Sequence, residues 1–224
     1  MNKALLLLLS MFFLLDASAQ EKGQVIDPNY LEDQLYFSLT YNILKDKPTS
    51  IAQNGFSGGF SFGFVKDIPV NEQRNFGFGL GFGYAKNVYI QNLKITEENF
   101  GTLFSLAQDY KVNRFSTGAL EIPIEIRWRN STPEKYKFWR VYGGFKVCYA
   151  LFSKSKFVAS DQKSIAKNIT EFNKVQYGIT LATGYHNWNL YFYYGLKSFF
   201  KKAQLNEENI EISDFNVGLK FYIM

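Results

Sequence analysis

The chain has 224 residues, a formal net charge of +5 and 18% aromatic residues, most of them Phe and Tyr. This length suits a single β domain. One cysteine and one histidine are too few for an intramolecular disulfide or a Cys/His metal cluster. The basic excess is spread along the chain, so we expect no nucleic-acid-binding surface.

The N-terminus has the pattern of a secretory signal peptide. A basic start with Lys3 precedes a mostly apolar run over residues 4–15, and residues 17–19 read Ala-Ser-Ala, an A-x-A cleavage site. The run is too short for a spanning helix, and an N-terminal anchor helix is the alternative. We therefore expect a signal peptide over residues 1–19 and one domain over residues 20–224.

Eight segments alternate between apolar residues and polar or small ones, as β-strands with two different faces do. They cover residues 34–44, 55–66, 75–86, 115–129, 138–153, 172–186, 189–200 and 212–223. In the second and third segments, small residues, mostly glycine, lie opposite the phenylalanines. No glycine-rich turn opens a helix there, so a phosphate-binding loop is not expected. Inward glycines would make room for bulky side chains from opposite strands.

Two connections are long enough to hold structure of their own. Residues 87–113 include an apolar patch and are expected either to form a short helix or to extend the flanking strands. Residues 154–169 are expected to form a polar loop.

The hairpin over residues 121–153 has the clearest pattern. Each arm alternates for about a dozen residues, whereas a strand of a soluble sandwich usually has about 5–6 and a tilted membrane strand needs about 9–11. One face is aromatic and aliphatic, and the other carries charges of both signs. This predicts a hairpin with one face toward lipid and one toward a polar lumen.

The same region resembles the PorT/SprT family, which are small outer-membrane β-barrels of Bacteroidetes associated with type IX protein secretion and gliding. The resemblance lies in residues 120–129 (LEIPIEIRWR), 131–140 (STPEKYKFWR), 53–60 (QNGFSGGF) and 217–222 (VGLKFY). It implies a role in assembling or stabilising the export machinery, with other type IX secretion components as partners.

The connections between the segments alternate in length. The short ones lie near residues 67–75, 130–137 and 186–189, and the long ones near residues 44–54, 86–113, 153–172 and 200–212. Outer-membrane barrels have short periplasmic turns and longer extracellular loops. We therefore predict an all-β, eight-stranded antiparallel transmembrane barrel of the OmpX/OmpA architecture, with both termini periplasmic and the long loops extracellular. Its expected partners are outer-membrane lipid, lipopolysaccharide and the barrel-assembly machinery.

The sequence offers little for catalysis. The single histidine, His186, lies at a predicted turn far from any acid in the sequence, whereas a general base needs a carboxylate or serine partner. Cys148 falls on a lumen-facing position and is expected to be an inert filler. We therefore predict no enzymatic activity, no cofactor and no metal.

Charged residues on the polar faces are expected to meet inside the barrel. They are Glu121, Glu125, Arg127, Arg129, Arg140, Lys146, Lys174, Lys197 and Lys220. The lumen of an eight-stranded barrel is just wide enough to be filled by side chains, and buried charges must be paired. We expect Glu121 and Glu125 to bridge Arg140, Lys146 or their neighbours.

A filled lumen places function on the loops, the rim or the outer wall. The candidate functions are support of type IX secretion, a structural or adhesive surface barrel of the OmpX kind, and a small pore or ligand-binding barrel. A soluble ligand-binding barrel is disfavoured, because its outward Phe and Trp faces would aggregate.

Overall fold

The computed structural model describes residues 33–98, 101–130, 137–205 and 208–223. The expected signal peptide lies outside the described residues. Leu31–Met224 forms one compact unit, and its described part is built from strands and their connections. No helix in this part of the chain is long and apolar enough to cross a membrane.

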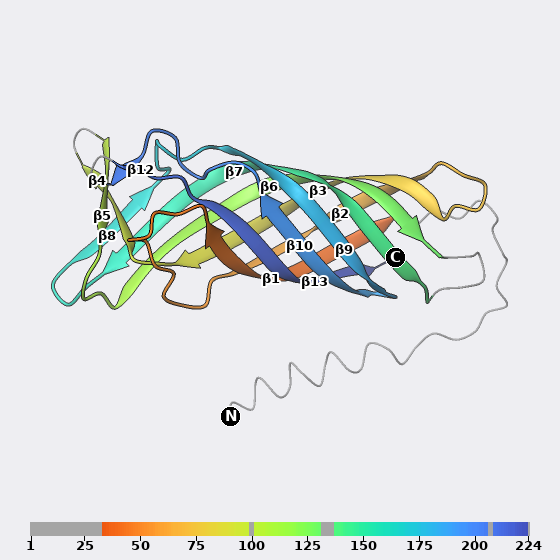
Figure 1. Ribbon diagram of the computed structural model, residues 1–224, viewed down its shortest axis with the longest axis horizontal. Coiled ribbons are helices and arrows are strands. Elements are labelled where there is room, and N and C mark those ends of the chain that lie inside the picture. The colour runs from red at the N-terminus through yellow and green to blue at the C-terminus, as the bar shows by residue number, and fades with distance from the viewer. Residues whose placement is uncertain (1–32, 99–100, 131–136, 206–207, 224) are drawn as a thin grey trace, which may run out of the picture. The chain divides into compact units, whose positions relative to one another are not determined.

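Eight antiparallel strands close into a barrel, which confirms the predicted fold (Figure 1). They are β1 (Gln34–Lys45), β2 (Gly58–Pro69), β3 (Phe76–Ile90), β6 (Val112–Arg129), β7 (Trp139–Val158), β9 (Val175–Tyr185), β10 (Trp188–Gly195) and β13 (Ser213–Ile223). Each strand pairs with the next of these, and β13 returns to β1 with a register from Leu35↔Ile223 to Lys45↔Ser213. Closure leaves the barrel no free edge, so the backbone N–H and C=O groups find partners within the wall.

The longer connections gather at one end of the barrel, which we call the long-loop end, and the short connections at the other, the short-turn end (Figure 1). The long-loop end carries small extra strands. They are β4 (Leu93–Glu98), β5 (Gly101–Leu106), β8 (Lys163–Lys167), β11 (Gln204–Leu205) and β12 (Glu208–Asn209). β4 pairs with β5, β8 with the end of β7, and β11 with β12.

One of the two long connections agrees with expectation and the other does not. In residues 87–113, β3 continues to Ile90, β6 begins at Val112 and the β4–β5 hairpin lies between them, so of the two alternatives strand extension is confirmed. The expected polar loop over residues 154–169 is wrong, because β7 continues to Val158 and pairs with both β6 and β8. Lysines take outward positions in this extension, so it lacks the apolar face that predicts a membrane strand.

The barrel wall is apolar outside and polar or small inside. On β3, Phe78, Leu80 and Phe82 are exposed, and the glycines between them face the lumen. A Cβ atom at Gly83 would lie 2.1 Å from the Tyr36 hydroxyl oxygen. The inward glycines therefore admit large side chains from other strands, as expected.

Outward aromatic residues form a belt near each end of the barrel. All three tryptophans, Trp128, Trp139 and Trp188, are exposed at the short-turn end. Exposed tyrosines, including Tyr149 and Tyr194, lie toward the long-loop end. Such belts mark the two membrane–water interfaces of an outer-membrane barrel.

A second apolar core lies under the long loops. It joins residues of the extended strands to residues of the connections. Phe115 contacts Phe172 and Phe200 at ring-centroid distances of 5.5 and 5.6 Å, and Tyr89 contacts Phe199 at 5.2 Å. This aromatic packing fastens the connections to the mouth of the barrel.

The two-faced wall predicts the effect of a charge on its outer face. Ile124 faces outward on β6, midway between Leu120, which pairs with Tyr84, and Trp128. We expect Ile124→Arg to lower the free energy of unfolding by about 2–4 kcal/mol, because arginine is costly at the bilayer midplane. Urea titration of the barrel folded in lipid vesicles, followed by tryptophan fluorescence, measures it.

The matched control is Leu103→Arg. Leu103 is also exposed, but it lies on β5 beyond the aromatic belt, opposite the uncharged Thr96. Its replacement should change the stability by less than about 1 kcal/mol. Equal losses at the two positions would contradict the assignment of the membrane-facing band.

Candidate functional site

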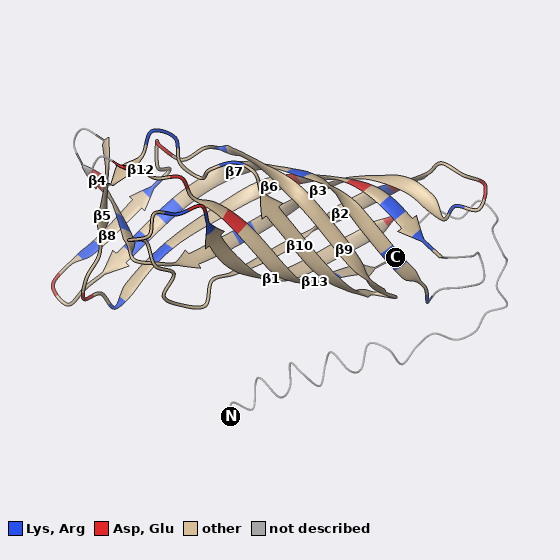
Figure 2. Cartoon of the chain, in the orientation of Figure 1, with Lys and Arg blue, Asp and Glu red and all other residues tan. Residues whose placement is uncertain are grey.

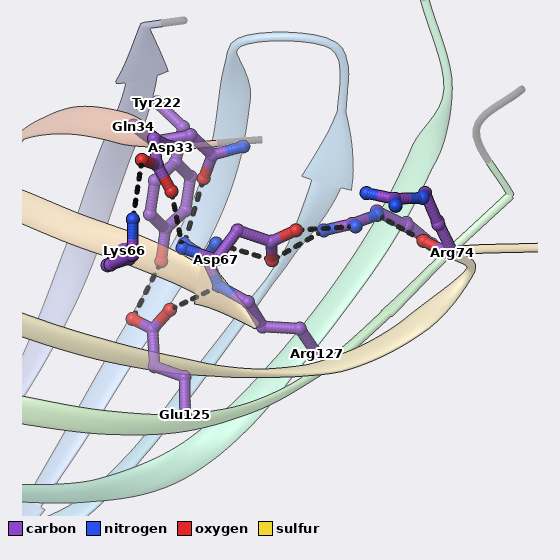
Figure 3. Close-up of polar contacts among 9 residues, drawn as sticks. Asp33, Gln34, Lys66, Asp67, Arg74, Glu125, Arg127 and Tyr222 are labelled. Carbon is purple, nitrogen blue, oxygen red and sulfur yellow. Dashed lines mark hydrogen bonds and ion pairs between the residues drawn. The ribbon is translucent and has the colours of Figure 1, made fainter. Parts of the chain in front are cut away.

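A chain of ion pairs crosses the lumen near the short-turn end (Figure 3). Its centre is Asp67 on β2, whose side chain is fully buried together with those of Arg127 and Arg129 on β6. Arg129 donates to both carboxylate oxygens of Asp67, at 2.8 and 2.7 Å, and Arg127 Nη1 donates to Asp67 Oδ1 at 3.1 Å. This is a bidentate, charge-assisted pair with a second arginine sharing one oxygen.

Arg127 links this centre to Glu125. Its Nε lies 3.1 Å from Glu125 Oε2, and its Nη2 donates to Gln34 Oε1 at 2.9 Å. The other oxygen of Glu125 accepts from Lys220 Nζ at 3.1 Å and from the Tyr222 hydroxyl at 3.0 Å. Because Lys220 and Tyr222 lie on β13, the contacts of Glu125 tie β6 to the closing strand across the lumen.

A second ion pair lies deeper in the barrel. Lys146 on β7 donates to Glu121 Oε2 at 3.0 Å, and the Tyr36 hydroxyl donates to Glu121 Oε1 at 2.6 Å. Lys146 Nζ also lies 4.5 Å from the centre of the Tyr193 ring. We call Asp67, Glu121, Glu125, Arg127, Arg129, Lys146 and Lys220 the lumen network.

Arg140 is buried beside the lumen network but takes no part in its ion pairs. Its guanidinium lies over aromatic rings, 4.6 Å from Phe138 and 5.5 Å from Tyr222. None of its nitrogens has a hydrogen-bond partner among the described residues. Of the expected bridges, the one between Glu121 and Lys146 is formed, and Glu125 pairs with Arg127 and Lys220. Neither carboxylate pairs with Arg140, because these other cations occupy both.

Two of the predicted lysines lie away from the lumen network. Lys174 precedes the first residue of β9 and is exposed. Lys197 lies two residues after the last residue of β10, with its Nζ 5.7 Å from the centre of the Tyr177 ring. Both lie where regular strand pairing has ended, so the alternation that predicted an inward direction no longer applies.

The most central residue of the network, Asp67, is absent from the sequence prediction. The second strand was expected to end at residue 66, whereas β2 continues to Pro69. The inward positions of this strand have odd numbers, and extending that alternation past Val65 would have placed Asp67 in the lumen. The residues after Asp67 have the composition of a turn, so the strand was predicted to end before Asp67.

The lumen network leaves little free space. It sets three carboxylates against four cations, with tyrosine hydroxyls and ring faces as further partners. A cavity between Lys146 and Asp214 has a volume of about 40 Å³, room for only a few waters, since one water needs about 10–15 Å³ on this measure. The arrangement therefore seals the barrel and cross-links strands that are not neighbours.

The residues considered for chemistry lie apart from one another. His186 lies at the turn between β9 and β10, and its Nδ1 has no hydrogen-bond partner among the described residues. Cys148 is a half-buried free thiol on β7. No group of three or more His, Cys, Asp or Glu residues that could hold a metal occurs in the described part of the chain.

The network predicts a large cost for removing its central acid. Asp67→Asn would remove the carboxylate that the buried guanidinium groups of Arg127 and Arg129 share, although Arg127 would keep Glu125, and we expect a loss of about 3–5 kcal/mol in the free energy of unfolding. Urea titration in lipid vesicles measures it. Glu72→Gln, an exposed acid in the β2–β3 turn, is the control and should cost less than about 1 kcal/mol. A small loss for Asp67→Asn would show that the network does not hold the barrel together.

Comparison with known proteins agrees with this architecture. The sequence model of a family described as "Outer membrane protein beta-barrel domain" matches residues 18–201, which include β1 to β10. No curated protein and no solved structure matched the chain. The family match covers most of the chain and identifies it as an outer-membrane protein. The chain belongs to the outer membrane β-barrel family.

Proposed function

We propose that this barrel supports type IX protein secretion and gliding motility in a bacterium of the Bacteroidetes, by assembling or stabilising the export machinery. The observation that carries the proposal is the sealed lumen. The interior at the short-turn end is filled by Asp67, Glu125 and the arginines beside them. The surfaces that remain for contact with other molecules are the rim and the outer wall.

The resemblance to the PorT/SprT family supports the same proposal. Of the four segments that carry the resemblance, 120–129 contributes four members of the lumen network: Glu121, Glu125, Arg127 and Arg129. The resemblance thus includes residues that fill the lumen.

The proposed orientation puts the short-turn end in the periplasm. The first and last described residues of the barrel meet there, with Leu35 paired to Ile223. Short periplasmic turns and long extracellular loops are the rule for this class. Both chain ends would then lie in the periplasm, and the core under the long loops would support an extracellular surface.

The proposed role is not enzymatic. His186 lies at the short-turn end, where no carboxylate or serine among the described residues hydrogen-bonds to it, and a general base needs such a partner. The proposed contacts are with lipid, lipopolysaccharide, the barrel-assembly machinery and secretion components.

A structural or adhesive surface barrel is the second candidate. It is favoured by the packed long-loop end, where Phe115, Phe172 and Phe200 hold the connections in place. A fixed extracellular surface suits adhesion as well as assembly, so the two functions differ in the partner and not in the fold.

The seal predicts the electrical behaviour of the barrel. Purified protein in planar bilayers should give no steady conductance above the empty membrane, because side chains fill an eight-stranded lumen. Reproducible single-channel steps would contradict the sealed lumen and favour the small-pore alternative. A larger outer-membrane porin reconstituted in the same lipid provides the positive control.

The secretion role predicts a genetic result. In-frame deletion should leave many unrelated cargo proteins in the periplasm, and the wild-type gene supplied on a plasmid should restore them to the medium. Quantitative proteomics of the two fractions measures this. Unchanged secretion, with the barrel shown to be expressed in the parent strain, would contradict the proposal and leave the surface-barrel function.

A further inference from the structure

Four cations gather on the outer wall of the barrel at the long-loop end. They are Lys86 on β3, Arg114 on β6, and Lys154 and Lys156 on β7. We call these four residues the basic face. Figure 2 shows Lys and Arg on β6, β7 and β8 at this end of the barrel.

The strand register sets like charges directly opposite each other in the basic face. Arg114 pairs with Lys156 across β6 and β7, and Lys154 pairs with Lys167 across β7 and β8. Like charges at directly opposite positions destabilise a sheet. The free barrel therefore carries a repulsion that a bound anion would relieve.

The cations of the basic face have no acidic partner among the described residues. The ion pairs in the described part of the chain lie in the lumen, between Lys66 and Asp33, and between Lys45 and Asp46. On the wall formed by β1 and β13, Lys45 is thus neutralised by its neighbour, whereas the β6–β7 wall keeps its positive charge.

A pocket lies within the basic face and has an apolar floor. Its volume is about 280 Å³, and it is lined by Lys86, Val88, Arg114, Ser116, Phe152, Lys154 and Lys156. Phe152 also borders a second pocket of about 670 Å³, whose cations are Lys174, Lys197 and Lys201. The register shift between Gly118 and Ala119 places Phe152 between the two, and its ring lies over Gly118, where a Cβ would come within 2.2 Å.

The basic face lies at the level of lipid headgroups. Lys86 follows the outward Tyr84 by two residues on the same face of β3, and Tyr149 lies on the outward face of β7 before the pockets begin. These tyrosines belong to the aromatic belt of the long-loop end, which marks the membrane–water interface. The pockets therefore begin just beyond the belt, at the height where phosphate groups of a lipid would lie.

We propose that the basic face binds the phosphate groups of an anionic membrane lipid. Two basic pockets on either side of Phe152 fit a glycolipid headgroup that carries two phosphates, with its acyl chains along the apolar wall below. Three observations support this assignment: the positive charge of the basic face, the apolar floor of its pocket and its position at the aromatic belt. The lipid site requires that the aromatic belt of the long-loop end lies at the membrane surface, but it does not require a role in secretion. An experiment can therefore contradict the lipid site without contradicting the proposed secretion role, and the reverse.

Native mass spectrometry of the barrel in neutral detergent micelles tests the site, with bis-phosphorylated lipid A as the probe. We expect Arg114→Gln with Lys156→Gln to weaken binding about tenfold or more, since each cation supplies a charge-assisted bond to phosphate. Lys163→Gln with Lys202→Gln removes the same charge from exposed residues of the same end that line neither pocket. This control should bind as the wild type does.

Thermal unfolding in the same micelles gives a second readout with opposite signs. Without lipid, the double variant of the basic face should unfold at a higher temperature than the wild type, because the repulsion is gone. With bis-phosphorylated lipid A the order should reverse.

Several outcomes would overturn the proposal. Equal lipid binding by the wild type and the basic-face variant would do so, as would equal stabilisation of the wild type by phosphatidylcholine. The same stabilisation by inorganic phosphate would assign the site to free phosphate. Stabilisation by a poly-glutamate peptide, without any by lipid A, would assign it to an acidic protein.

Discussion

The closure of β13 onto β1 is the constraint on which the rest of this structure depends. Backbone N–H and C=O groups in hydrocarbon must be paired, so the sheet has to return to its first strand. Closure at eight strands fixes a narrow lumen. Every inward side chain must then find both space and a partner inside. The glycines of β2 and β3 provide the space, and the ion pairs around Asp67 provide the partners.

Space and charge come from different strands of the wall, and β3, which supplies space, is the direct neighbour of β6, which supplies charge. The inward positions of β3 are small, and a Cβ at Gly79 would lie 2.7 Å from Arg127 Nε. Inward positions of β6 and β7 carry the long charged side chains that reach across, and β1 and β13 add tyrosine hydroxyls as further partners. A glycine on one strand thus leaves the space in which a side chain of another strand forms its ion pair. Because buried charges are costly when a partner is lost, the interior tolerates few single changes, and the surface is the freer place for function to be added.

Much of this could be predicted from alternation alone, and the missing parts have physical causes. The eight strands, the inward glycines and the lumen positions of Glu121, Glu125 and Lys220 follow from period-two patterning, which depends only on neighbouring residues. The choice of partners does not. Lys220 meets Glu125 because the tilt of the strands and the closing register bring residues 95 positions apart to one level, and no local pattern encodes that distance. The extended end of β7 was missed because an outward lysine suits a strand end at the membrane surface as well as it suits a loop. Lys174 and Lys197 were misplaced for the converse reason, because alternation was continued beyond the strands that produce it.

The extension of β6 and β7 beyond the aromatic belt bears on what a sealed barrel can do. Each strand residue adds about 3.3 Å of length, so the extensions, with the core around Phe115, raise the connections above the lipid. A surface held by packing binds a partner without the entropic cost of ordering its loops. A barrel that served only as a membrane anchor would need neither the extensions nor their core. Both features favour a protein whose task is to hold other molecules in a fixed position relative to the membrane, whether a lipid headgroup on the wall or a component of a larger assembly on the rim.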